Sequence, residues 1–171
     1  MKREIRKVAL QTRNALTKEQ QLEYSQRIVE QLKPYLKGNI AIYQSFGSEV
    51  SLQSLELDTY YLPVVKEHYQ MDFVACHQQT VFQKNSYGID EPTSQQIVNP
   101  SALDVMVIPM VAFDKDNQRL GYGKGYYDRY LKQTSCLKIG VAFSCQKVDT
   151  VYADANDVRL DLIITENRIY K

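Results

Sequence analysis

A run of alternating glycines in the second half of the chain lies among side chains that could bind a phosphate group. The run reads Arg119-Leu-Gly-Tyr-Gly-Lys-Gly-Tyr-Tyr-Asp128, and its glycines are Gly121, Gly123 and Gly125. Glycine allows backbone N–H groups to approach an anion closely. Arg119 can donate two parallel hydrogen bonds to a phosphate, and Lys124 adds a second positive charge. The run therefore predicts an anion-binding loop.

A carboxylate closes this glycine-rich run. Asp128 is expected one turn into a helix over residues 124–132, whose positive N-terminal end would also favour a phosphate. Magnesium in proteins is usually held by one or two carboxylates together with phosphate oxygens. Asp128 is therefore a candidate magnesium ligand.

The glycine-rich run departs from three common nucleotide- and RNA-binding motifs. A P-loop would need glycine at 118 and serine or threonine at 125, where Gln118 and Gly125 stand. The dinucleotide-binding pattern would need its third glycine at Tyr126. An RNA-recognition strand is matched at residues 124–126 and lost at residues 127–128. From these residues alone, a glycine-rich surface turn anchored by its tyrosines remains an alternative.

Two helices are expected to precede the first strand. Residues 2–16 place apolar side chains at helical spacing, with most basic residues off that stripe. Thr17-Lys-Glu-Gln20 has the pattern of a capping box that opens a second helix. Gly38 is the expected C-terminal end of that helix.

The strands are expected in short, continuous apolar runs, which are typical of strands covered on both faces. These runs interleave with helices, so the sequence predicts an α/β fold with a mostly parallel central sheet. We expect one domain over residues 1–171. The segment 76–101 is polar and lacks periodicity, which favours a long excursion of the kind that is often functional. The expected strands are 39–43, 60–65, 71–75, 102–109, 137–143 and 162–165.

Charge and cysteine usage narrow the function classes. The chain has 21 Lys and Arg against 20 Asp and Glu, and this balance argues against a broad nucleic-acid-binding surface. Three cysteines without CxxC spacing and only two histidines make a zinc site an unfavourable interpretation. The sequence has no signal-peptide pattern and no apolar run of membrane-spanning length. We therefore expect a soluble, cytoplasmic protein.

The run from residue 107 to Asp128 closely resembles the signature of the 5-formyltetrahydrofolate cyclo-ligases, which are also called methenyltetrahydrofolate synthetases. Other segments resemble the family in the same order along the chain. They are Lys2-x-x-x-Arg6, Ser45-Phe-Gly-Ser-Glu49-Val50, Leu62-Pro63-Val64, Tyr87-Gly-Ile-Asp-Glu91-Pro92 and Asn156-Asp157. This resemblance implies a three-layer, Rossmann-like fold of the sugar-phosphate isomerase and CoA-transferase type.

The resemblance also implies roles for particular residues. ATP is expected to bind at two places, the N-terminal helix and the glycine-rich run. Glu49 is expected to contact the folate, and Tyr87 to stack on the pterin where the family usually has Trp. Asp128 and Asp157 are expected to hold Mg²⁺, and Arg119 and Lys124 to act on the transferred phosphoryl group. The expected ATP-binding residues are Lys2, Arg3, Arg6, Arg119, Gly121, Tyr122, Gly123, Lys124, Gly125, Tyr126 and Tyr127.

Two departures from the family pattern bear on these roles. Tyr122 stands where some members carry Arg, which removes one phosphate contact. Asn156 stands where the family usually has His, so no imidazole role transfers to it.

The implied reaction is the ATP-dependent conversion of 5-formyltetrahydrofolate to 5,10-methenyltetrahydrofolate. We separately expect the protein to be a monomer. Two other hypotheses remain at this point. One is an enzyme of the sugar-phosphate isomerase or acyl-CoA type, which would bind phosphate without hydrolysing ATP. The other is a nucleotide- or RNA-binding module that uses Lys124 and the neighbouring tyrosines, and salt-sensitive RNA binding would favour it.

Overall fold

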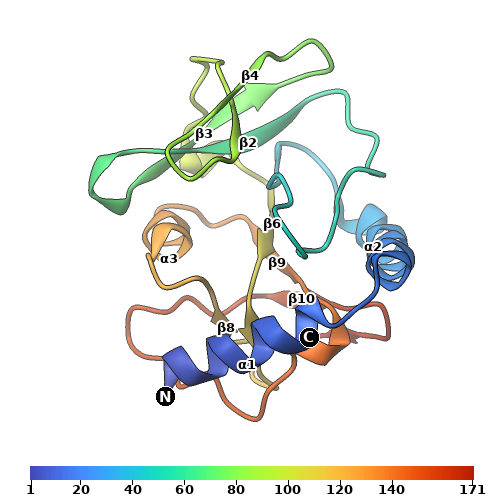
Figure 1. The fold of residues 1–171 in the computed structure, drawn as a ribbon. Coiled ribbons are helices and arrows are strands. Elements are labelled where there is room, and N and C mark those ends of the chain that lie inside the picture. The colour runs from blue at the N-terminus through green and yellow to red at the C-terminus, as the bar shows by residue number, and fades with distance from the viewer.

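A seven-stranded sheet forms the centre of the molecule, in a computed structural model that describes all 171 residues (Figure 1). Its strand order is β11-β10-β9-β6-β1-β2-β3. The neighbours from β10 to β2 run parallel, and both edge strands, β11 and β3, pair antiparallel. The prediction of a mostly parallel sheet is confirmed. The strands are β1 (Ile40–Ala41), β2 (Tyr60–Val65), β3 (Met71–Cys76), β6 (Val105–Pro109), β9 (Leu137–Val141), β10 (Leu162–Ile164) and β11 (Ile169–Tyr170).

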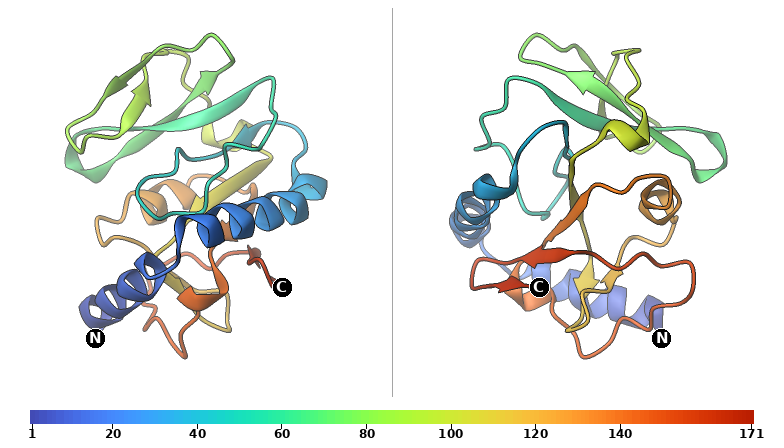
Figure 2. Two further views of the ribbon diagram at one scale, coloured as in Figure 1. Left: turned by 45° about the vertical axis from the view of Figure 1, so that its right-hand side comes forward. Right: turned by 180° about the vertical axis from the view of Figure 1, so that it is seen from behind.

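Three α-helices surround the sheet. Two of them, α2 and α3, cover its opposite faces, and α1 crosses below (Figures 1 and 2). Four short 3-10 helices lie at 33–35, 67–69, 100–102 and 144–146. The α-helices are α1 (Lys2–Asn14), α2 (Lys18–Leu32) and α3 (Tyr126–Leu131).

The start of α2 follows the sequence prediction, but its end does not. Thr17 and Gln20 exchange the two hydrogen bonds of a capping box, at 2.9 and 3.1 Å. The predicted end at Gly38 is wrong, because Pro34 cannot continue the helix and the chain passes into a 3-10 turn after Leu32. Gly38 instead takes a positive φ of +75° beside Asp104, where a Cβ atom would collide with the carboxylate.

The core has one part on each face of the sheet. On one face, the α2 residues Ile28, Val29 and Leu32 are fully buried against the strands. On the other face, Tyr130 and Leu131 of α3 pack against Phe73, Met106 and their neighbours. A smaller apolar cluster holds α1 against the segment after β6 through Ala9, Val111 and Leu120. The sheet is therefore the middle of three layers, as expected.

Two small hairpins were not expected from the sequence. The pair β7 (Ala112–Phe113) and β8 (Arg119–Leu120) lies between β6 and the first glycine of the run, Gly121, where a single turn was predicted. The pair β4 (Phe82–Lys84) and β5 (Asp90–Pro92) lies within the excursion 76–101. Both are antiparallel pairs of two or three residues a strand, too short to give a periodic pattern.

Several predicted elements are also shorter than expected. The first strand covers only 40–41 of 39–43, and the helix predicted over 124–132 is limited to α3. Pro63 lies inside β2 but beyond Tyr61, the only β2 residue paired with β1, so its missing N–H interrupts no hydrogen-bond ladder there. No helix combines the length and apolar character needed to cross a membrane.

Candidate active site

A cavity of about 610 Å³ opens beyond the carboxyl ends of β1 and β6. Tyr43 and Gln44, which follow β1, line it together with Pro109 at the end of β6. Ligands of open α/β sheets bind at this edge, and the volume is typical of a site for a small organic molecule. The other walls come from α1, the glycine-rich run, the turn between β4 and β5, and the loop 152–158.

The cavity brings together almost all of the residues that were predicted from the sequence. Arg3 is the exception, because it is exposed on α1 and does not line the cavity. One position along a helix rotates a side chain by about 100°, which turns Arg3 away from the face that Lys2 and Arg6 share. The predicted residues that line the cavity are Lys2, Arg6, Glu49, Tyr87, Arg119, Gly121, Tyr122, Gly123, Lys124, Gly125, Tyr126, Tyr127, Asp128 and Asp157.

Two arginine side chains lie against the backbone of the glycine-rich run. Arg6 donates from Nε to the carbonyl of Gly121 at 2.7 Å, and Arg129 donates to the carbonyl of Lys124 at 2.7 Å. Gly123 has a φ of +98°, and a Cβ atom there would lie 3.2 Å from the Arg6 guanidinium. Glycine is thus required both by the conformation and by the close approach of the arginine.

Arg119 is a buried cation with an unused donor. Its exposed fraction is only 5%, and its Nη2 donates to Asp128 at 3.1 Å. Its guanidinium also lies over the Tyr127 ring, 5.4 Å from the centroid. The Nε atom is buried and has no hydrogen-bond partner. Buried donors are normally paired, so Arg119 has more hydrogen-bond donors than its one partner Asp128 satisfies. A cation of this kind in the wall of the cavity suits an anionic ligand.

The two predicted metal ligands each keep one carboxylate oxygen free of hydrogen bonds. Asp128 accepts only at Oδ1, from Arg119 and from the Val158 N–H. Asp157 accepts only at Oδ2, from Lys2 at 2.6 Å and from the Asp154 N–H at 2.8 Å. Each carboxylate therefore keeps an oxygen that could coordinate a cation.

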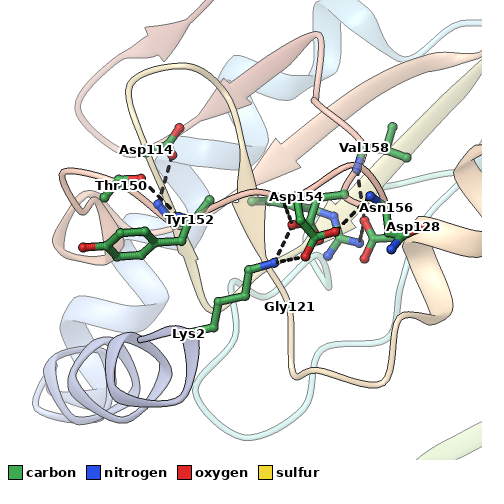
Figure 3. A network of polar contacts seen from close by, with 12 residues as sticks. Lys2, Asp114, Gly121, Asp128, Thr150, Tyr152, Asp154, Asn156 and Val158 are labelled. Atoms are coloured by element: carbon green, nitrogen blue, oxygen red, sulfur yellow. Dashed lines mark hydrogen bonds and ion pairs between the residues drawn. The ribbon is translucent and has the colours of Figure 1, made fainter.

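Lys2 joins the first helix to the loop 152–158. Its ammonium group donates to Asp154 at 2.8 Å as well as to Asp157, and Figure 3 shows it reaching this loop beside Asp128. Burial alone would lower the pKa of Lys2, but the two carboxylates outweigh burial and raise it. Lys2 was predicted to bind phosphate, and in this structure its partners are carboxylates.

Glu49 is a further carboxylate in the wall of the cavity. It accepts hydrogen bonds from the Phe46 N–H at 2.9 Å and from the Tyr122 hydroxyl at 3.0 Å. Burial raises the pKa of Glu49, and these two hydrogen bonds and the Arg13 charge offset the rise only in part. The carboxylate is therefore held in one position, and its burial disfavours the charged form.

The turn between β4 and β5 approaches the glycine-rich run from the opposite side of the cavity. The hydroxyls of Tyr87 and Tyr126 are 3.0 Å apart, and the ring of Tyr69 packs edge-on against that of Tyr126. The hydrogen bond to Tyr87 is the main cause that raises the pKa of Tyr126 to about 12. Tyr87 is 48% exposed, so its ring face remains accessible.

Sequence reasoning missed some residues at the site. Arg13 and Asp154 have direct polar contacts with predicted site residues, and the β2–β3 side supplies an apolar wall of Leu62, Pro63 and Met71. Arg13 follows Arg6 by seven residues, which places both on one helix face and could have indicated it. Nothing in the local sequence marks the apolar wall, because the same residues also form strand core.

Comparison with known protein families matches residues 1–166 to the 5-formyltetrahydrofolate cyclo-ligase family. The chain belongs to this family. A 5-formyltetrahydrofolate cyclo-ligase of Mycoplasma pneumoniae is 37% identical over 173 residues, which cover 96% of this chain and 98% of that protein. The 5-formyltetrahydrofolate cyclo-ligase of Escherichia coli (strain K12) is 32% identical over 178 residues, which cover 94% of this chain and 98% of that protein.

Solved structures agree with this membership of the 5-formyltetrahydrofolate cyclo-ligase family. The 5,10-methenyltetrahydrofolate synthetase of Aquifex aeolicus has a TM-score of 0.88 at 33% identity, covering 99% of this chain and 92% of that chain. The corresponding synthetase of Mycoplasma pneumoniae has a TM-score of 0.76 at 34% identity, covering 96% and 98%. The family match extends from the N-terminus past Asp157 and so includes every predicted site residue.

Proposed function

We propose that this protein catalyses the ATP-dependent cyclisation of 5-formyltetrahydrofolate to 5,10-methenyltetrahydrofolate, with release of ADP and phosphate. The observation that carries the proposal is that one cavity holds both a glycine-rich, cationic loop and a separate anchored carboxylate. The first suits a nucleotide polyphosphate, and the second suits the hydrogen-bond donors of a pterin ring. Family membership supports the same activity.

The cations around the glycine-rich run would hold the ATP phosphates. Arg119 places a positive charge in the cavity wall, and Arg6 lies against the loop backbone. Lys124 is exposed at the cavity, with only the Tyr69 ring beneath its ammonium group at 5.4 Å. Preorganised positive charge of this kind lowers the energy of a phosphoryl transfer, because it meets the charge that is spread over the phosphoryl oxygens.

The folate would lie between Glu49 and the aromatic and apolar wall. The Glu49 carboxylate can accept hydrogen bonds from the ring N–H groups of a pterin. Tyr87 offers a stacking face on the opposite side, and Leu62 and Met71 supply apolar surface. This arrangement would direct the formyl group toward the phosphate-binding loop.

The chemistry requires no protein nucleophile. The formyl oxygen attacks the γ-phosphorus of ATP and the bond to ADP breaks, so the poor oxygen leaving group becomes a phosphate ester. N10 of the folate then forms a bond to the activated carbon and loses its proton, and the C–O bond breaks as phosphate departs with the former formyl oxygen. The protein contributes by aligning the reacting atoms and neutralising phosphate charge.

We further propose that Asp128 and Asp157 hold Mg²⁺ together with the ATP phosphates. Each has one carboxylate oxygen free of hydrogen bonds, and each lines the cavity. The ion would supply charge neutralisation at the phosphates.

We also propose that the protein is a cytoplasmic monomer that does not bind nucleic acid. Three free cysteine thiols support the cytoplasmic location, and the near-balanced charge argues against nucleic-acid binding.

The proposed activity is tested by incubating the purified protein with 5-formyltetrahydrofolate and MgATP and following methenyltetrahydrofolate optically. We expect product only when both substrates are present, with one ADP released for each product formed. An absence of product, together with ATP or RNA binding that does not depend on folate, would favour a nucleotide-binding module instead.

A further inference from the structure

A chain of hydrogen bonds connects α1 to the carboxylate at the folate end of the cavity. Arg13 donates from Nη2 to the Tyr122 hydroxyl at 2.9 Å, and that hydroxyl donates to Oε1 of Glu49 at 3.0 Å. The family resemblance assigned Tyr122, which lies between two glycines of the glycine-rich run, to the ATP site. Its hydroxyl is instead bonded to Arg13 and Glu49.

Arg13 is suited to hold this chain in one geometry. Its side chain is only 3% exposed, and each of its three nitrogens donates a hydrogen bond. The other two acceptors are the Ser48 hydroxyl at 2.9 Å and the Met110 carbonyl at 3.3 Å. A planar guanidinium fixed at three points leaves one orientation for the Tyr122 hydroxyl. Arg13 does not itself line the cavity.

We infer that Tyr122, held by Arg13, is a positioning residue for the folate carboxylate Glu49 rather than a contact for ATP. This inference rests on the proposed function and assigns two residues within it. Both Glu49 oxygens then have a fixed donor, one from Tyr122 and one from the Phe46 N–H.

The charged and titratable groups that face Glu49 bear on the pKa of its carboxyl group. They are Tyr43 from the end of β1, Tyr127 from α3, and Tyr122 and Arg13 themselves. Arg13 is the one cation in this set. A donor to a carboxylate lowers its pKa, so removing the Tyr122 hydroxyl raises the pKa of Glu49 further above its usual range.

The test compares Tyr122→Phe with the wild-type protein in steady-state kinetics over a range of pH. We expect the KM for 5-formyltetrahydrofolate to rise about tenfold, as for loss of a hydrogen bond to a charged group. The KM for ATP should stay unchanged. The acid limb of kcat/KM for folate should move to higher pH, which a purely structural defect would not cause. Tyr170→Phe, which removes a hydroxyl without a hydrogen-bond partner, is the matched control.

A second variant keeps the inference falsifiable if one substitution disturbs folding. Arg13→Lys retains the positive charge but loses the planar guanidinium that donates to three acceptors. It should raise the KM for 5-formyltetrahydrofolate in the same way as Tyr122→Phe, but by less. The double variant with Tyr122→Phe should add little, because the two residues act in series.

The outcomes separate the inference from the proposed function. Product formation by the wild type, with a raised ATP KM and an unchanged folate KM in Tyr122→Phe, would overturn the inference and leave the function intact. An unmoved acid limb would also overturn it. Failure of the wild type to form product would overturn the function, and the inference with it.

Discussion

At the residue scale, the positively charged side chains in and beside the cavity fall into three sets according to the partner that each one binds. Arg6 and Arg129 hold the loop backbone, whereas Arg119 and Lys2 pair with carboxylates. Lys124 alone has no ion pair or side-chain hydrogen bond, only an aromatic face beneath it. An exposed, unpaired ammonium group is the one most available to a transferring phosphoryl group.

Replacement of Lys124 should therefore reduce turnover without affecting the fold. We expect Lys124→Ala to lower kcat/KM by about 10²-fold or more, since it removes charge that stabilises the transition state. Steady-state kinetics measure this, with thermal melting to check the fold. Lys115→Ala, at an exposed position in the turn between β7 and β8, should behave as wild type. Unchanged kinetics in Lys124→Ala would remove Lys124 from the site.

Asp128 should set the magnesium requirement of the reaction. We expect Asp128→Asn to need about tenfold or more Mg²⁺ for half-maximal rate, because an amide oxygen is a poorer ligand for a hard cation than a carboxylate. A magnesium titration at saturating ATP measures this. Asp116→Asn, which is exposed and outside the cavity, is the control. Identical titrations for the two variants would contradict the assignment of Asp128.

Glu49 should lower the stability of the folded protein at neutral pH. Burial raises its pKa in the folded state above the unfolded value, so its contribution to stability is greatest below the unfolded pKa. That contribution is lost as the pH rises through the folded-state pKa. Glu49→Gln does not titrate and should gain Tm relative to wild type as the pH increases.

Thermal melts of Glu49→Gln and wild type between about pH 4 and 8 test this expectation. The difference in Tm should grow by a few degrees with pH, because about 1 kcal/mol corresponds to roughly 2–4 °C in a protein of this size. A difference that is constant with pH would show that Glu49 is not perturbed. Functional sites commonly reduce stability in this way.

At the element scale, the site is built from short segments that have few backbone hydrogen bonds of their own. The glycine-rich run has little backbone pairing of its own, and α3 has only six residues. The turn between β4 and β5 reaches across the cavity and meets the start of α3 through the Tyr87 and Tyr126 hydroxyls. The backbone N–H of Val65 donates to Glu91 at 2.8 Å, which ties this turn to β2.

The pair of tyrosine hydroxyls should be detectable by titration. Tyr87→Phe removes the main cause of the raised pKa of Tyr126, so that pKa should fall from about 12 toward the ordinary tyrosine value. Carbon-13 NMR of the tyrosine Cζ resonances, recorded as a function of pH, measures the shift. Tyr152→Phe, which lies in the loop 152–158, should leave the Tyr126 titration unchanged. The same Tyr126 titration in Tyr87→Phe and wild type would mean that the turn does not contact α3 in solution.

The sequence could predict the elements that bury continuous apolar surface. Residues 60–65 match β2, and the Thr17 capping box marks the start of α2. The β4 strand could not be predicted, because Phe82, Gln83 and Lys84 are all exposed and carry no burial pattern. Such short pairs are fixed by the tertiary positions of their ends rather than by local preference.

The site residues that could be predicted are likewise those that lie close together in the sequence. The glycines and charges of residues 119–128 are close in sequence, so their chemistry was visible there. The contacts of Arg13 with Ser48, Met110 and Tyr122 cross separations of 35, 97 and 109 residues, which no local pattern reports. For the same reason, the sequence did not show that Lys2 would pair with Asp154 and Asp157.

At the scale of the whole molecule, the sheet order places the two halves of the site side by side. The β1 and β6 strands are neighbours in the sheet although their paired residues, such as Ile40 and Val105, lie 65 positions apart in the chain, and both strands end at the cavity. Glu49 follows β1, and the glycine-rich run follows β6 after the β7–β8 hairpin. The parallel arrangement therefore brings to one edge the carboxylate and the loop that we propose to bind folate and phosphate.

The central claim is that this edge activates the formyl oxygen by phosphorylation. The most direct test uses 5-formyltetrahydrofolate labelled with ¹⁸O in its formyl group, MgATP and the wild-type protein, with mass spectrometry of the released phosphate. We predict one ¹⁸O atom in each phosphate released, in step with methenyltetrahydrofolate formation. Product formation with unlabelled phosphate, and the label in water, would contradict the account.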